Sequence, residues 1–285
     1  MVVIPAQAIE AYRAETFRLS PGKRLRDIED AIEYVNERGY VFFWPIRGIE
    51  FPSLWTATAG NRPVADAHDD PGHVTWGWKD GLLGKRRWYY AKVLRRKSTM
   101  ISMEIAPFFY ALSENYGAPE EDYLTLYEQG RMTMDAKRVY EMLLTEGPLD
   151  TVSLRRALHM SSVQSENRFN RALVDLQVDF KICPIGIAQT GAWRYSFIYE
   201  VTARHLPALV EQAEHIQESE ARRCLVECAV RSLGALQIED LSKLLGWKGE
   251  TVQRVVNDFV ERGFIKRGLR MENSQGEWLA LNKFV

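Results

Sequence analysis

The sequence predicts a mainly α-helical protein with small antiparallel β wings, an α+β fold built of tandem winged helix-turn-helix modules. An amphipathic helix that runs into a β-rich segment recurs three times, at residues 24–43, 165–186 and 250–269. The last two copies each follow two further helical patterns and precede a second short strand pattern. Hydrophobic residues make up 46% and charged residues 26% of the chain, as in ordinary globular proteins.

The length of 285 residues suggests about two domains or more. We expect an N-terminal domain at 1–130, with a winged-helix-like element and a basic, aromatic insert. A winged helix at 131–205 and a C-terminal winged helix at 206–285 should follow. In the first and third copies the helix ends at Glu-Arg-Gly, which places Gly39 and Gly263 as C-terminal caps. The sequence leaves open whether the first copy completes a third module, because two clear helices do not precede it.

The middle module is predicted from helix periodicity and turn residues. Its expected elements, in order, are a helix at about 134–145, a turn at Gly147 and Pro148, a short helix capped by Asp150 or Thr151, a third helix from Ser165, a strand at 181–185, a turn at 189–191 and a strand at 193–199. The third helix should bury Phe169, Ala172, Leu173 and Leu176, which follow the spacing of one helix face.

The last module repeats this order. Its expected elements are helices at 218–233, 238–245 and 251–262, a strand at 264–269, a turn at 273–276 and a strand at 278–281. The first of these helices places Cys224 and Cys228 on its apolar stripe, which favours core positions over a metal or redox site.

Charge and composition exclude several classes of protein. The 37 basic and 38 acidic residues give a net charge of −1, but residues 79–97 carry about +7 and residues 114–150 about −6. Three cysteines indicate a reducing compartment, and neither an apolar run of about 18 residues nor a signal peptide is present. We therefore expect a cytoplasmic protein that does not enter a membrane. No phosphate-binding loop or dinucleotide fingerprint occurs, so we expect no nucleotide or other cofactor.

The polar faces of the third helices supply candidate DNA contacts. Arg, Asn and Gln side chains bond bidentately to base edges in the major groove, while wing residues meet phosphates. The candidates on the middle module are Gln164, Asn167, Arg168, Asn170, Arg171 and, on its wing, Arg194; those on the last module are Gln253, Arg254, Asn257, Lys266, Arg267 and Arg270. The alternative is a solvated helix face or a surface for another protein.

A basic and aromatic strip lies at residues 85–97. Its candidate contacts are Lys85, Arg86, Arg87, Trp88, Tyr90, Arg95, Arg96 and Lys97. Basic groups neutralise phosphates and aromatic rings stack on exposed bases. The alternation of residues suits a strand with one wet face. Alternatively, the strip pairs with the acidic 114–150 segment inside the protein.

A third cluster combines His68, Asp69, Asp70 and His73. Imidazole and carboxylate groups can bind a divalent metal or serve as general acid and base. The spacing matches no metal motif, and Asp-Asp-Pro-Gly is also an ordinary turn, so we predict no metal site.

The chain resembles the AlkZ/YcaQ family of DNA glycosylases, which unhook interstrand crosslinks and excise alkylated bases. The resemblance covers most of the chain and is best in RFNRALVDLQVDFKICPIG, in the wing GAWRYSFIYE and in YVFFWPIRGIEFPSLW. It implies tandem winged helices that act on double-stranded DNA.

The family's catalysis rests on a Gln-X-Gln or Gln-X-Asp motif, whose position falls on Phe42, Phe43 and Trp44. Aromatic rings cannot orient a water molecule or stabilise a sugar cation as amides and carboxylates can. Two interpretations remain. In the first, the chain keeps the scaffold without this chemistry and uses Phe42 and Trp44 to stack on a base or to wedge it out of the helix. In the second, a carboxylate elsewhere in the chain is the catalyst, and Asp69 and Asp70 are the first candidates.

The leading interpretation is a glycosylase-like protein that binds damaged or distorted duplex DNA as a monomer, since several modules in one chain can span a site. The alternative is a non-enzymatic winged-helix transcriptional regulator, which usually binds as a symmetric dimer. A scaffold that binds another protein is the third hypothesis, and it predicts no salt-sensitive DNA binding.

Overall fold

The computed structural model describes residues 2–191 and 193–285 of the chain. The chain packs into two compact units. The terminal unit comprises Met1–Trp78 and Ser219–Val285, and the central unit comprises Lys79–Glu218. The sequence-continuous division at 1–130, 131–205 and 206–285 stays a prediction. Among the described residues, no helix combines the length and apolar character needed to cross a bilayer.

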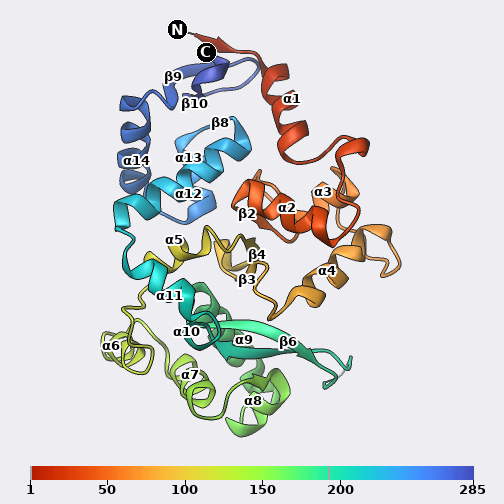
Figure 1. The fold of residues 1–285 in the computed structure, drawn as a ribbon, viewed down its shortest axis with the longest axis vertical. Coiled ribbons are helices and arrows are strands. Elements are labelled where there is room, and N and C mark those ends of the chain that lie inside the picture. The colour runs from red at the N-terminus through yellow and green to blue at the C-terminus, as the bar shows by residue number, and fades with distance from the viewer. Residues whose placement is uncertain (1, 192) are drawn as a thin grey trace. The chain divides into compact units, whose positions relative to one another are not determined.

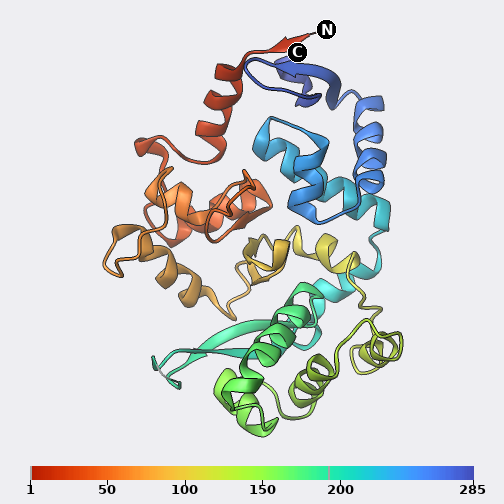
Figure 2. The same cartoon turned by 180° about the vertical axis from the view of Figure 1, so that it is seen from behind.

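The central unit contains a β hairpin, several short helices and one complete module (Figures 1 and 2). Its elements are β3 (Tyr89–Lys92), η3 (Leu94–Arg96), β4 (Ser98–Ile101), α5 (Ala106–Ala111), α6 (Asp122–Glu128), α7 (Met134–Glu146), β5 (Leu149–Asp150), α8 (Thr151–Ala157), α9 (Val163–Val178), β6 (Ile182–Ala188), β7 (Ser196–Val201), α10 (Thr202–His205) and α11 (Pro207–Glu214). From α7 to β7 the order is helix, strand, helix, helix, strand, strand, which is that of a winged helix.

Local sequence explains this module. Asp150 caps α8 by accepting hydrogen bonds from the backbone of Val152 and Ser153, as predicted. Helix α9 begins after the cap Ser162 and buries the predicted stripe of Phe169, Ala172, Leu173 and Leu176. The stripe joins a core with Val139, Tyr140 and Leu143 of α7. The antiparallel strands β5, β7 and β6 form one sheet in that order.

The terminal unit joins the beginning and the end of the chain. Its elements are β1 (Val3–Ile4), α1 (Ala6–Thr16), η1 (Pro21–Lys23), α2 (Ile28–Arg38), β2 (Tyr40–Phe42), α3 (Leu54–Ala59), η2 (Pro71–His73), α4 (Val74–Leu82, which continues into the central unit), α12 (Glu218–Leu233), β8 (Ala235–Leu236), α13 (Ile238–Leu245), α14 (Gly249–Glu261), β9 (Ile265–Met271), β10 (Trp278–Leu281) and η4 (Asn282–Phe284). The bounds of α12, α13 and β10 match those predicted.

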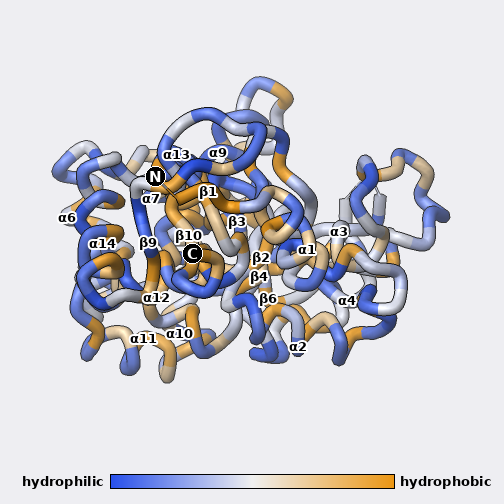
Figure 3. Tube along the Cα trace, turned by 90° about the horizontal axis from the view of Figure 1, so that it is seen from above, coloured by the Kyte–Doolittle hydropathy of each residue, from blue (hydrophilic) through white to orange (hydrophobic). Residues whose placement is uncertain are grey.

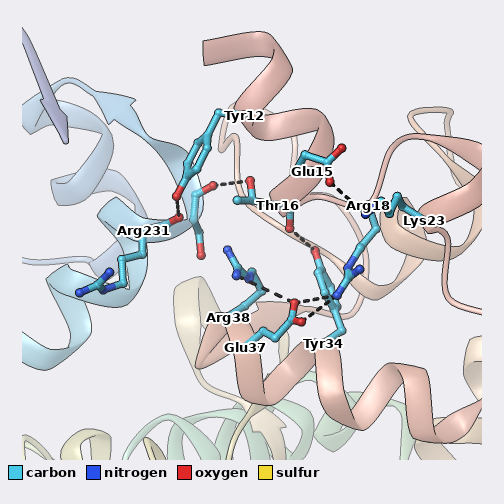
Figure 4. A network of polar contacts seen from close by, with 10 residues as sticks. Tyr12, Glu15, Thr16, Arg18, Lys23, Tyr34, Glu37, Arg38 and Arg231 are labelled. Carbon is cyan, nitrogen blue, oxygen red and sulfur yellow. Dashed lines mark hydrogen bonds and ion pairs between the residues drawn. The ribbon is translucent and has the colours of Figure 1, made fainter. Parts of the chain in front are cut away.

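Polar contacts tie α1 to α2 and α12 in this unit (Figure 4). The hydroxyls of Tyr12 and Thr16 donate to the carbonyl oxygens of Arg231 and Ser232 at 2.6 and 2.7 Å. The buried Tyr34 hydroxyl donates to the Thr16 carbonyl at 3.2 Å. Strand β1 also pairs in parallel with β9, so the N-terminal segment extends the sheet of the last module.

The predicted caps and core of this unit are only partly as expected. Gly39 follows α2 with a φ of 78° and Gly263 follows α14 with a φ of 69°, a conformation that favours glycine. Cys224 and Cys228 are half-buried rather than core residues, because Leu225 and Ala229 occupy the centre of the buried stripe of α12.

Candidate nucleic-acid interface

Helix α9 presents a polar face to solvent. All five of its predicted contact residues are exposed: Gln164, Asn167, Arg168, Asn170 and Arg171. They are exposed because the opposite, apolar stripe packs on α7. This is the third helix of the module, the element that enters the major groove in helix-turn-helix proteins.

Two carboxylates engage the arginines of this face. Arg168 donates through Nε and Nη2 to the two carboxylate oxygens of Asp135, both at 2.8 Å. This guanidinium lowers the pKa of the Asp135 carboxyl. Arg171 lies 3.9 Å from Asp175. Among the described residues, none makes a side-chain hydrogen bond to Asn167 or Asn170, so the two amides are accessible to a ligand.

The β3–β4 hairpin places a basic tip beside α9. Arg96 forms an ion pair with Asp175 at 2.6 Å, and the Lys92 backbone N–H donates to the Gln177 side chain at 3.1 Å. Arg95, Arg96 and Lys97 are exposed. We call these three residues the hairpin tip. Because these contacts join the hairpin to α9, the hairpin tip and the polar face of α9 form one continuous basic surface.

The backbone of the hairpin tip is unusual. Arg95 and Arg96 have φ values of 52° and 62°, in the left-handed region. Tight hairpin turns place Asn and Gly at such positions, and a bulkier residue there costs about 1 kcal/mol or more. Arg95 and Arg96 therefore carry charged side chains at two positions whose left-handed backbone conformation favours Asn or Gly.

The aromatic residues of the basic strip do not share its exposure. Trp88 and Tyr90 are only 4% and 8% exposed, and Tyr89, which lies between them, is 1% exposed. Tyr89 stacks on Phe180 at 4.5 Å, while Tyr90 lies 6.1 Å from the ring of Phe197. Both faces of β3 are covered by core aromatics, so the expected strand with one wet face is absent here. The rings of Trp88 and Tyr90 are buried and therefore cannot stack on a base, contrary to the prediction.

The wing of the middle module carries an exposed tryptophan that sequence reasoning did not select. Strand β7 begins at Ser196 rather than at residue 193, so Trp193 and Arg194 lie in the wing turn. Trp193 is 90% exposed and Arg194 is exposed with a φ of 51°. An exposed indole ring beside a guanidinium can contact a ligand, since tryptophan combines a large apolar face with a polar N–H. Gly191, with a φ of 84°, marks the wing turn in the sequence, and a turn that continued past Gly191 would have contained Trp193.

The last module offers a second polar surface. Arg254 and Asn257 of α14 are exposed and Gln253 is half-buried. The Asn257 side-chain oxygen accepts bonds from Gln253 at 2.9 Å and from Arg267 at 3.0 Å. Lys266, Arg267 and Arg270 of β9 are exposed. Figure 3, coloured by hydropathy, shows hydrophilic and hydrophobic stretches next to one another at β9.

The aromatic residues at the position of the family motif divide into core and surface. Phe42 is fully buried and packs edge-on against Phe51 at 6.0 Å, so its ring has no face for a base. Trp44 is half-buried and lies 5.7 Å from Trp76, which is 36% exposed. The buried indole N–H of Trp44 meets no hydrogen-bond acceptor within the part of the chain that the structure describes. Trp44 and Trp76, rather than Phe42, can offer rings to a planar ligand.

Two members of the cluster of His68, Asp69, Asp70 and His73 make structural contacts. Asp70 accepts a hydrogen bond from the Gly72 backbone at 2.8 Å and from both Nη atoms of Arg62. Arg62 lowers the pKa of the Asp70 carboxyl, which stays ionised and engaged. His73 bonds the Ala65 carbonyl at 2.8 Å, and Asp69 is exposed. Across the described residues, no group of His, Cys, Asp and Glu has the arrangement of a metal site.

These features define a mainly helical α+β protein with small antiparallel sheets and exposed basic and amide side chains. A profile of the AlkZ-related family matches residues 25–246, which is most of the chain. The chain belongs to the AlkZ-related family. The structure is similar to that of the Streptomyces sahachiroi DNA glycosylase AlkZ, with a TM-score of 0.57 and 12% identity over 99% of this chain and 71% of that one. At this identity the likeness concerns the fold. A search of curated proteins finds no match.

Proposed function

We propose that the protein binds double-stranded DNA as a monomer, through tandem winged helices, and prefers damaged or distorted duplexes. The observation that carries this proposal is the exposed polar face of α9, with Asn167 and Asn170 accessible beside the hairpin tip. Amide groups read base edges and the neighbouring cations neutralise phosphates. Membership of a family that includes a DNA glycosylase supports the same partner.

Each surface has a different role in this proposal. Helix α9 lies in the major groove, and the hairpin tip contacts the backbone. Trp193 and Arg194 at the wing tip contact the duplex where stacking is disturbed, since apolar wedges enter weakened base steps. Helix α14 and the basic residues of β9 supply a second set of contacts.

The chemistry of the site favours recognition over cleavage. Phe42 and Trp44 stand where a glycosylase of this family has amides or carboxylates, and Asp70 is held by Arg62. We infer that Trp44 and Trp76 hold an extruded base without cleaving its glycosidic bond. The cytoplasm is the compartment we assign to this activity.

The test is binding to two fluorescent duplexes, one intact and one with an abasic site, across a salt series. A third duplex, which carries an alkylated base, is incubated with the protein and then treated with alkali, and its strand breaks are counted against a sample without protein. We expect affinity that falls steeply with salt, a preference for the abasic duplex and no strand breaks. Strand breaks would overturn the non-catalytic assignment. A dimer with strong preference for one palindromic sequence would favour a transcriptional regulator instead. Absence of salt-sensitive binding to either duplex would overturn the proposal and favour the scaffold.

Removing the amides of α9 tests whether this helix reads DNA. We expect Asn167→Ala with Asn170→Ala to reduce duplex affinity about tenfold while the slope of log affinity against log salt stays unchanged, because neither side chain is charged. Fluorescence anisotropy at several salt concentrations measures both quantities. The matched control is Gln212→Ala, which removes an exposed amide from α11 of the same unit. Equal affinities for the double variant and the control would move base readout to α14.

A further inference from the structure

A buried lysine lies at the base of the β6–β7 wing tip. Lys79, near the end of α4, is 2% exposed. Its Nζ atom lies 2.9 Å from the Tyr195 hydroxyl and 2.9 Å from Oδ1 of Asp80. The Tyr195 hydroxyl donates to the same Asp80 oxygen at 2.9 Å. The three polar groups therefore form a closed triangle between α4 and the wing.

Aromatic rings surround the ammonium group. Its Nζ atom lies 4.9 Å from the ring centre of Phe197, 5.5 Å from that of Tyr195 and 5.7 Å from that of Tyr90. Burial lowers the pKa of Lys79, and the carboxylate of Asp80 opposes this effect. Rings and a carboxylate together compensate for the lost hydration of a buried cation. At 2% exposure the amine cannot reach a substrate, so its role is structural.

The position of Tyr195 gives this triangle a specific consequence. Tyr195 directly follows the exposed Trp193 and Arg194, and it is the residue before β7 begins at Ser196. The hydroxyl of Tyr195 ties the end of the wing turn to α4. A long β hairpin without such a tie would move freely at its tip, and a mobile contact loses binding free energy when it is ordered.

We propose that Lys79, Asp80 and Tyr195 form a latch that holds the wing tip in the position from which Trp193 and Arg194 contact DNA. The three are positioning residues, because they act through the wing tip and not on the DNA itself. This inference rests on the proposed function and names the residues that preorganise one of its contacts.

The test is Tyr195→Phe, which removes the hydroxyl and keeps the ring that packs on Phe197 at 5.5 Å. We expect affinity for the abasic duplex to fall about fivefold, because a wing tip that is no longer held must be ordered when it binds. Tyr123→Phe is the matched control, because it removes a tyrosine hydroxyl that bonds Glu141 in the same unit at 3.1 Å. It should leave the affinity unchanged.

A double-mutant cycle separates positioning from general destabilisation. In a Trp193→Ala/Arg194→Ala background, Tyr195→Phe should cause no further loss of affinity, because the contacts it positions are absent. A further fivefold loss in that background would overturn the proposal, and so would an equal loss in Tyr123→Phe.

Amide hydrogen exchange tests the latch without DNA. We expect amides of residues 189–196 to exchange several-fold faster in Tyr195→Phe, with the rest of the central unit unchanged. If the wild-type protein binds neither duplex while exchange accelerates as expected, the latch stands as a fixation of the wing and the DNA-binding function fails. Unchanged exchange at the wing overturns the latch whatever the DNA result.

Discussion

Reversal of the charge on the hairpin tip, Arg95→Glu with Lys97→Glu, is expected to weaken duplex binding about 10- to 100-fold at moderate salt. The two side chains are exposed and, among the described residues, have no ion-pair partner to compensate for the change. Each cation that neutralises a phosphate also releases a counterion. The slope of log affinity against log salt should therefore become shallower by about two. Anisotropy titrations across a salt series measure both effects.

Two variants control for damage to the backbone turn. Arg95→Lys with Lys97→Arg keeps both charges and should keep the affinity. Arg95→Gly removes one charge and relieves the left-handed backbone at a φ of 52°, so it should weaken binding without loss of stability. If the charge-reversed protein binds as tightly as the wild type with the same salt slope, the hairpin tip does not contact DNA. Binding that fails equally in the charge-conserving variant would show a folding defect.

Secondary structure was predictable wherever one periodic stripe decides burial. In α9 and α14 the apolar residues recur at helical spacing. Helix α14 lies within two residues of the expected bounds at either end, and α9 begins two residues before the expected start at Ser165. Caps such as Asp150 and Gly39 were predictable for a different reason, since the preference for these residues at a helix end depends on the local backbone alone. The pairing of β1 with β9 was not, because a two-residue strand carries no periodic signal and its partner is far away in the sequence.

The candidate site was less predictable than the fold. The sequence indicates which α9 residues face outward, but not that Asp135 engages Arg168, because that ion pair joins two helices. Trp88 and Tyr90 have the composition of a stacking surface, yet core packing from both sides covers them. Local pattern predicts amphipathicity, whereas tertiary packing decides which aromatic residues remain accessible. Trp193 shows the opposite case, an apolar residue left exposed by a wing turn longer than expected.

The Phe42→Ala variant discriminates between two roles for Phe42, packing in the core and stacking on a base. As a fully buried ring against Phe51, Phe42 should contribute to stability, and its truncation is expected to cost about 3–5 kcal/mol in the free energy of unfolding. Urea denaturation followed by circular dichroism measures this loss. Phe42→Leu, which retains most of the apolar volume, should cost less than about 1.5 kcal/mol.

The DNA affinity of the folded fraction completes this comparison. Phe42→Leu should bind both duplexes as the wild type does, because its ring is covered. Trp44→Ala should lower the preference for the abasic duplex with a smaller loss of stability, because that indole is half-buried and lies beside Trp76. The reverse pattern, in which Phe42→Ala unfolds at the wild-type urea concentration but loses the preference for the abasic duplex, would show that Phe42 leaves the core to stack on a base. In that case both Phe42 and Trp44, which stand where the resemblance places the polar residues of the Gln-X-Gln or Gln-X-Asp motif, would contact a base. The packing instead places Phe42 in the core and leaves Trp44 half-buried beside Trp76, where our proposal has it contact an extruded base.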